Sequence, residues 1–206
     1  DDFPSTFNLA TLDGTNGFEI IDSITFAGNR IGASVAGVGD VNGDGIDDVA
    51  VGAPNFTTRL DIGQSEVNFY TPGRAYVIYG SDTGFSSNVD VSSLVSADGA
   101  TLSAKFVDFG IGRDLAPIGD FNGDGFDDFI VGAPDYSGAE NYQGSAYIIF
   151  GAPTGVFGDI DLETLTPSQG FRVIGGEYYD LVGIGLSGAG DFNGDDVVDN
   201  ADLNLL

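Results

Sequence analysis

The feature that most constrains this 206-residue sequence is an acidic segment that occurs three times. The copies begin at Asp40, Asp120 and Asp191, at steps of 80 and 71 residues. Two further landmarks keep the same order: Val-Gly-Ala-Pro begins at positions 51 and 131, and a Gly-x-Ala-Tyr segment begins at 73 and 144. Landmarks in fixed order at such a period indicate a repeat architecture. The first repeat is longer by an insertion, residues 55–72.

Each repeat predicts four short strands, which in the first repeat are residues 31–38, 48–51, 75–79 and 100–106. These runs are rich in β-branched and aromatic residues and are bounded by Gly, Pro and Asn. The middle strands are apolar at successive positions, so both of their faces should be buried. A sandwich domain would need about seven strands per unit, too many for this length. We therefore predict an all-β fold of β-propeller blades, each with four antiparallel strands.

The repeats divide the chain into a leading outer strand (about 16–25), two complete blades (about 30–106 and 110–176), and a partial blade or calcium loop (about 182–206). Closed propellers have roughly four to eight blades, so two to three blades cannot close a ring. We expect further blades, supplied by a longer chain, which we favour, or by other copies. The first residues resemble neither a signal peptide nor a start Met, which favours a mature or excised segment.

The charge balance excludes several classes of protein. With 32 acidic and 6 basic residues the formal charge is −26, and His and Cys are absent. This composition excludes Ser-His-Asp and Cys-His catalysis, zinc fingers and disulfide frameworks. It disfavours nucleic acid and anionic membranes as partners, and no apolar run is long enough for membrane insertion.

The acidic segments carry the chemistry of the sequence. Oxygen-bearing side chains at alternate positions of a Gly-rich loop can wrap Ca²⁺, which takes six to eight oxygen ligands, whereas Mg²⁺ resists such cages. Ordinary Asn-Gly turns are the alternative, but turns do not require carboxylates at positions 1, 5 and 9. The apolar position 7 should contribute its carbonyl, with its side chain in the core. The expected ligands are Asp40, Asn42, Asp44, Ile46 and Asp48 in the first loop, and Asp120, Asn122, Asp124, Phe126 and Asp128 in the second.

The third loop departs from this pattern. Its candidate ligands are Asp191, Asn193, Asp195, Val197, Asp199 and, at position 12, Asp202. The spacing suits an EF-hand-type loop that enters a short helix, and residues 190–206 resemble half of a dockerin module. We expect calcium at this loop too, with either a propeller-type or an EF-hand-type backbone.

The first two repeats resemble the FG-GAP repeat, which is the blade unit of integrin alpha propellers. The segments that carry the resemblance in the first repeat are Ile31-Gly32, Asp40 to Asp48 and Val51 to Pro54. Those in the second repeat are Asp120 to Asp128 and Val131 to Pro134. The resemblance implies a calcium-binding β-propeller on a secreted, extracellular or cell-surface protein, with a non-enzymatic role in adhesion or in protein or glycan binding. The alternative is a structural or accessory propeller domain of a larger secreted enzyme or surface protein. An intrinsic hydrolase is disfavoured, because the clustered carboxylates are committed to metal.

The insertion 55–72 is the candidate surface for a protein or glycan ligand. In a four-stranded meander it should project from the end opposite the calcium loops, with Phe56, Arg59, Phe69 and Tyr70 available for recognition. A lineage-specific surface loop is the alternative.

Overall fold

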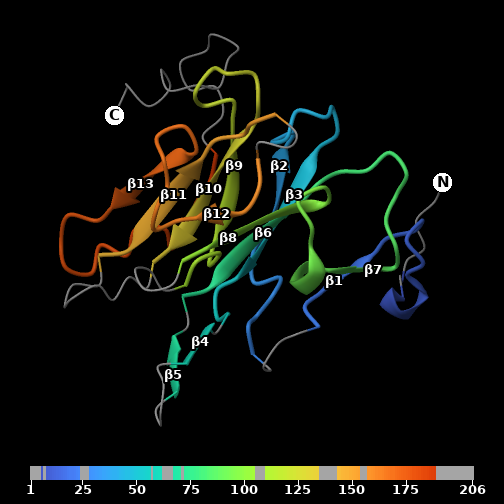
Figure 1. Cartoon of the computed structure of the whole chain (residues 1–206), viewed down its shortest axis with the longest axis horizontal. Coiled ribbons are helices and arrows are strands. Elements are labelled where there is room, and N and C mark those ends of the chain that lie inside the picture. The colour runs from blue at the N-terminus through green and yellow to red at the C-terminus, as the bar shows by residue number, and fades with distance from the viewer. Residues whose placement is uncertain are drawn as a thin grey trace.

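The computed structural model describes residues 6, 8–23, 28–56, 58–61, 67–70, 72–104, 110–134, 143–153 and 157–188. These residues form thirteen β-strands and two 3-10 helices, Leu9–Thr11 and Val91–Ser93, with no α-helix among them. Neither 3-10 helix, each of three residues, approaches the length of a membrane span, and the described residues hold no other candidate. The predicted all-β class is confirmed, as a partial propeller of four-stranded blades (Figure 1).

The first blade contains β2 (Val35–Gly39), β3 (Asp48–Ala53), β6 (Arg74–Ile78) and β8 (Gly99–Ser103). They lie in chain order from the inner to the outer edge, and each pair is antiparallel. The second blade repeats this arrangement with β9 (Leu115–Gly119), β10 (Asp128–Ala133), β11 (Ser145–Ile149) and β13 (Gly170–Ile174). The inner strands β2 and β9 lie next to each other, so the sheets pack face to face.

Short parallel strands, which the sequence analysis did not predict, add to this meander. β12 (Ile160–Asp161), from the connection between β11 and β13, pairs with the outer edge of β8 in the preceding blade. β7 (Asn88–Asp90), from the equivalent connection of the first blade, pairs with β1 (Glu19–Ile21). Each connection therefore reaches back to the outer strand that precedes its own blade.

The main core lies between the two blades. On β3, Ala50 faces this core, whereas Val51 and Ala53 face a second cluster on the opposite side of the sheet. The middle strands are thus covered on both faces, as their successive apolar residues predicted. Phe129 and Val131 of β10 enter the main core from the second blade and are fully buried.

The insertion of the first repeat contains an antiparallel hairpin of β4 (Thr58–Asp61) and β5 (Val67–Tyr70). It follows the end of β3, whereas the first acidic loop precedes β3, so the two project from opposite ends of the blade (Figure 1). Phe56 is not an exposed recognition residue, because it is half-buried with the Arg74 guanidinium carbon 3.7 Å from its ring centroid. The side chains of Arg59, Phe69 and Tyr70 lie outside the described part of the structure.

Candidate metal-binding loops

The first two acidic segments connect the inner strand of each blade to the next strand. Position 1 follows the last residue of the inner strand, and position 9 is the first residue of β3 or β10. The Gly residues at positions 4 and 6 have positive φ, 73° and 88° in the first loop and 76° and 93° in the second. Other residue types rarely adopt this conformation, which explains why the loop motif contains Gly there.

The carboxylate at position 1 holds the turn together. Asp40 Oδ1 accepts the N–H groups of Gly43 and Asp44, at 2.7 and 3.0 Å, and its Oδ2 accepts the N–H of Gly45 at 2.8 Å. Asp120 accepts from Asp124 and Gly125 in the same way, at 2.9 and 2.8 Å. Such local side-chain-to-backbone bonds fix a short loop without any strand pairing.

Positions 3 and 5 are joined to each other. In the first loop Asn42 Oδ1 accepts the Asp44 N–H at 2.8 Å, and the Asn42 amide donates to Asp44 Oδ2 at 3.0 Å. In the second loop Asn122 and Asp124 make the same two bonds, at 2.8 and 2.9 Å. Positions 3 and 5 therefore have the same hydrogen-bond pattern in both loops.

Position 9 provides a buried carboxylate in each loop. Asp48 and Asp128 are only 1% and 0% exposed. Their Oδ1 atoms accept the N–H groups of Gly80 and Gly151, both at 2.8 Å, and their Oδ2 atoms accept a loop N–H, from Val41 at 3.1 Å and from Asn122 at 3.2 Å. Burial raises the pKa of both carboxyls to about 6. A buried negative charge is unfavourable by itself, and a nearby cation would stabilise it.

The side chain at position 7 does not enter the core, so this part of the prediction is wrong. Ile46 and Phe126 are half-buried and belong to neither core cluster. Ile46 packs on Gly80, where a Cβ would collide with its side chain. The Phe126 ring leans over Gly43 of the first loop and leaves no room for a Cβ there. Position 7 therefore covers glycines at the surface end of the blades.

The two loops contact each other directly. Asp127 Oδ2 accepts the N–H of Asp40 at 2.9 Å, and the Asp127 N–H donates to the Asp40 carbonyl at 3.2 Å. Sequence reasoning missed Asp127, as well as Gly80 and Gly151, which donate to position 9. Asp127 corresponds to Asp47 of the first repeat, and Gly151 corresponds to Gly80. A full alignment of the repeats could therefore have pointed to these positions.

The donor types in each loop fit a hard cation: three carboxylates, one amide and one backbone carbonyl. In the described part of the chain no group of three or more acidic side chains has already converged as a metal cluster. Their oxygens accept loop N–H groups instead. The third set, Asp191, Asn193, Asp195, Val197, Asp199 and Asp202, lies outside the described residues, as does the dockerin-like segment.

Comparison with known proteins agrees with this architecture. The FG-GAP repeat matches residues 32–78 and 112–149, which include both described loops. The chain carries two FG-GAP repeats. The chain as a whole is similar to integrin alpha-PS2 of Drosophila melanogaster. The two are 32% identical over 199 residues, which is 95% of this chain and 12% of that protein.

Two other kinds of match extend the comparison. Phosphatidylinositol-glycan-specific phospholipase D of Dictyostelium discoideum is 34% identical over 81% of this chain and 17% of that protein. Integrin alpha-5 of Xenopus laevis is 31% identical over 73% of this chain and 13% of that protein. The chain thus spans less than a fifth of the length of these relatives.

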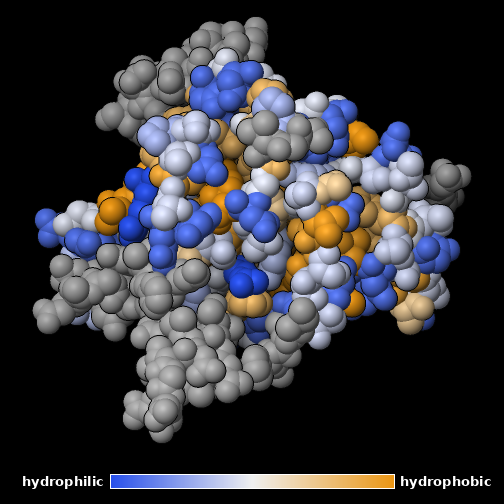
Figure 2. Space-filling model, in the orientation of Figure 1, coloured by the Kyte–Doolittle hydropathy of each residue, from blue (hydrophilic) through white to orange (hydrophobic). Residues whose placement is uncertain are grey.

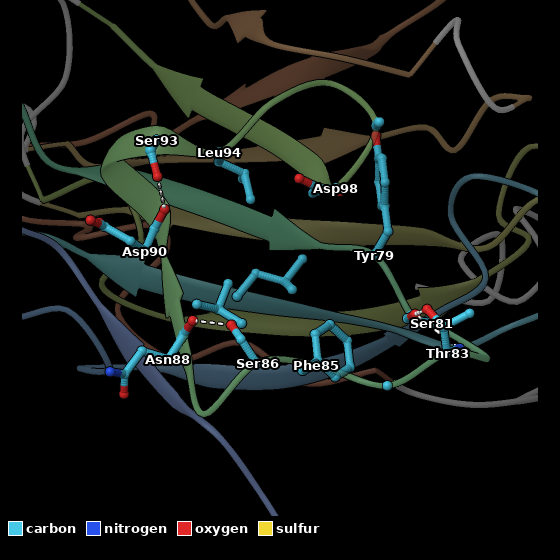
Figure 3. A pocket seen from close by; sticks show the side chains of 15 residues that line it. Tyr79, Ser81, Thr83, Phe85, Ser86, Asn88, Asp90, Ser93, Leu94 and Asp98 are labelled. Atoms are coloured by element: carbon cyan, nitrogen blue, oxygen red, sulfur yellow. Dashed lines mark hydrogen bonds between the residues drawn. The ribbon is translucent and has the colours of Figure 1, made fainter. Parts of the chain in front are cut away.

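A cavity of about 390 Å³ lies at the connection between β6 and β8 (Figure 3), and its lining includes Gly80, which donates to Asp48 of the first loop. Tyr79, Phe85 and Leu94 contribute apolar surface to it, and several hydroxyl groups surround them. The Ser93 hydroxyl donates to the Asp90 carbonyl at 3.2 Å, so part of the polar lining is used to fold the connection. In Figure 3 the side chains of Asn88 and Asp90 point away from Tyr79 and Phe85. The cavity was not predicted from the sequence.

Proposed function

We propose that this FG-GAP segment is a calcium-stabilised module of an extracellular or cell-surface β-propeller, with a role in adhesion or ligand binding and no catalytic role of its own. The observation that carries the proposal is the recurrence of one loop structure around a buried carboxylate, Asp48 in the first blade and Asp128 in the second. An ordinary turn requires neither that carboxylate nor the two others in the same nine residues.

Calcium would be held by side-chain oxygens at positions 1, 3, 5 and 9 and by the carbonyl at position 7. In the first loop these are Asp40, Asn42, Asp44, Asp48 and Ile46, and the second loop offers the equivalent set. When bound, the ion supplies positive charge among crowded carboxylates and rigidifies the loop. The hydrogen bonds from Gly80 and Gly151 orient the position 9 carboxylates, and those at position 1 fix the turn. We extend the proposal to the third loop on its sequence alone.

The expected affinity favours a location outside the cell. Extracellular modules of this chemistry have Kd values of about 10⁻⁴ to 10⁻³ M, so millimolar calcium would add on the order of 1 kcal/mol per site. Cytosolic calcium would leave such sites empty. The match to integrin alpha chains supports the same location.

Thermal unfolding with and without calcium tests the proposal. The first two sites, at about 1 kcal/mol each, should together contribute roughly 4–8 °C to the rise in Tm when millimolar calcium replaces chelator, and magnesium should do much less. The double variant Asp44→Asn and Asp124→Asn should lose most of this response. Asp82→Asn, at an exposed position outside both loops, is the matched control. Equal Tm values in calcium and in chelator for the unaltered chain would refute the metal proposal.

The ligand-binding role is tested through the insertion that contains β4 and β5. We propose that this hairpin contacts a protein or glycan ligand, because it projects from the end opposite the metal loops. Replacing residues 55–72 with the shorter equivalent segment of the second repeat, residues 135–143, provides a matched variant. Binding on a glycan or matrix-protein array should be lost in this variant. A cooperative thermal transition would show that the variant, which loses the Phe56 contact with Arg74, still folds. Equal binding by both chains would remove the insertion from the proposal.

A second candidate is a structural propeller domain of a larger secreted enzyme. The matches to phosphatidylinositol-glycan-specific phospholipase D favour it. The array distinguishes the two candidates, because a purely structural domain should bind no glycan or matrix protein.

A further inference from the structure

Each blade has a short segment, which we call the clasp, that binds the outer strand preceding that blade. The clasp of the second blade is residues 157–162, in the connection between β11 and β13. The clasp of the first blade is residues 85–91, in the connection between β6 and β8. Both clasps run parallel to the outer strand of the preceding blade. Ile160 lies opposite Leu102 and Asp161 opposite Ser103, just as Val89 lies opposite Ile20 and Asp90 opposite Ile21.

Polar groups of the clasp bind the neighbouring strand. Asp159 Oδ1 accepts the N–H of Thr101 at 2.8 Å, and the Leu162 N–H donates to the Ser103 carbonyl at 2.9 Å. In the other clasp, Asp90 Oδ1 accepts the N–H of Ser23 at 3.1 Å. These bonds join segments that are 58 to 67 residues apart in the sequence.

Apolar side chains of the clasp cover the outer strand as well. Phe157, Ile160 and Leu162 are buried in the main core together with Ala100 and Leu102 of β8. In the other clasp, Phe85 stacks against Phe18, with ring centroids 4.3 Å apart. A clasp therefore buries the apolar face of the outer strand on which it lies.

The outer strand of the second blade, β13, has no such cover within the described residues. Its Phe171 and Val173 are 42% and 40% exposed, whereas the equivalent Ala100 and Leu102 of β8 are both fully buried. Among the described strands β13 pairs only with β11, so its other edge presents backbone groups that have no ladder partner. Figure 2 shows apolar surface where β13 ends, at the left of the view. A groove of about 490 Å³, lined by Phe171, Leu162, Leu165 and Pro167, lies beside the start of the strand.

The inner part of the same face is already occupied. Val182 makes a parallel bridge to Gly144, as Ile111 does to Gly73 between the two blades. The Leu186 N–H donates to Asp114 Oδ2 at 2.7 Å. The segment that begins the second blade, near Ile111, lies against the first blade. Residues 182–188 lie against the second blade in the equivalent position. Within the described part of the chain, the outer part of this face stays uncovered.

We propose that the exposed edge of β13 is the docking site for the clasp of a further FG-GAP blade, the blade whose first strand begins with residues 182–188. The occupant is an extended segment parallel to β13, with the pattern Asn or Asp, aliphatic, Asp, aliphatic. Its first aliphatic residue lies opposite Val173 and its second acidic residue opposite Ile174. A second copy of this chain is not the occupant, because its two clasps already bind its own β1 and β8. Residues 182–188 also fill the position that the inner strand of a second copy would need. This inference goes beyond the proposed function and does not depend on metal binding.

Disulfide trapping tests the site and its register, because the chain contains no cysteine. The probe is a synthetic peptide with the sequence of residues 153–166, in which Asp161→Cys supplies a single thiol. Oxidised glutathione is present throughout as the two-electron oxidant, because joining two thiols in a disulfide releases two electrons and two protons. With the Ile174→Cys variant, mixed-disulfide formation should be at least about tenfold faster than with a peptide that carries Asp159→Cys instead, because only the first thiol is in register. It should also be about tenfold faster than with Val95→Cys, an exposed position on another surface.

Two controls keep the outcome interpretable. The double variant Ser103→Cys and Asp161→Cys should form an internal disulfide, since these residues are paired in the structure. A peptide that also carries Ile160→Asp and Leu162→Asp should react no faster than the off-register peptide. Equal rates for both peptide registers would overturn the proposal. Preferential formation of a disulfide-linked dimer of the Ile174→Cys chain would also overturn it, by identifying a second copy as the occupant.

Discussion

The two described acidic loops share most of their hydrogen bonds but differ in burial. Asn42 of the first loop is only 1% exposed, whereas Asn122, its equivalent in the second, is half-buried. The difference arises from the neighbouring blade, since Phe126 leans over Gly43 and Asp127 binds Asp40. The loop structure therefore follows from the spacing within the loop, and its shielding from water follows from what packs beside it.

The sequence of the third segment extends this comparison. Where the second loop has Asp127, the equivalent position of the third segment is Val198. A valine side chain cannot accept the hydrogen bond that Asp127 accepts from the first loop. The contact between the first and second loops is therefore not a property of every consecutive pair of repeats.

The largest expected effect comes from weakening the core between the two blades. Phe129→Ala removes a fully buried ring from the core between them and should lower the free energy of unfolding by about 3–5 kcal/mol. Hydrogen exchange at the Asp44 amide should then approach the rate at the Asp124 amide. Ile130→Ala, a half-buried neighbour that faces away from this core, is the control. An unchanged difference in exchange between the loops would show that blade packing is not its cause.

The second prediction compares substitutions of the two side chains at position 7, Phe126 and Ile46. Phe126→Ala uncovers the first loop and should lower the free energy of unfolding by about 1–2 kcal/mol, because half of a large ring is buried. Ile46→Ala removes only a contact within its own blade and should cost less. Chemical denaturation measures both. A larger loss for Ile46→Ala would contradict the proposed shielding of the first loop.

A smaller effect is expected at position 8. Asp127→Ala deprives the Asp40 N–H of its acceptor and should cost about 1 kcal/mol. Asp47→Ala changes the equivalent but exposed residue of the first loop and should stay within about 0.5 kcal/mol of the unaltered chain. Denaturant titration in chelator measures both without interference from metal. Equal losses for the two variants would show that the contact between the loops does not stabilise the fold.

The last effect concerns a property in which the loops are alike. Burial raises the pKa of both Asp48 and Asp128 to about 6, above the ordinary value of 3.8. Protonation of these groups therefore favours the folded state, so their contribution to stability is complete below pH 3.8 and is lost as the pH rises through 6. In chelator, Tm should rise as the pH falls from 7 to 5. The Tm of the double variant Asp48→Asn and Asp128→Asn should rise less over the same pH range. An equal rise in Tm would show that other carboxyl groups cause the effect.

The sequence predicted the strands and the loops well, because their signals are local. The second strand of the first blade was predicted over residues 48–51 and is β3, Asp48–Ala53, and the third was predicted over 75–79 and is β6, Arg74–Ile78. Each is an apolar run between glycine-rich turns, which few other structures would satisfy. The spacing of acidic residues likewise located both loops, whereas calcium binding itself stays a prediction.

The contacts between blades could not be predicted in the same way. The strands β7 and β12 have three and two residues, too few for a periodic signal, and each pairs with a strand of the preceding blade. The direction of the Phe126 side chain depends on the space above Gly43, which exists only after the blades pack. Such features arise from residues far apart in the sequence, so one repeat read alone does not reveal them.

The backward reach of each clasp has a consequence for synthesis on the ribosome. A nascent outer strand such as β8 can pair with β6 as soon as it emerges, but its other edge stays bare until Ile160 and Asp161 have been translated. At about 5–20 residues per second, that interval lasts several seconds for each blade. The newest blade of a growing polypeptide is therefore the one most exposed to chaperones and to mispairing with neighbouring nascent chains.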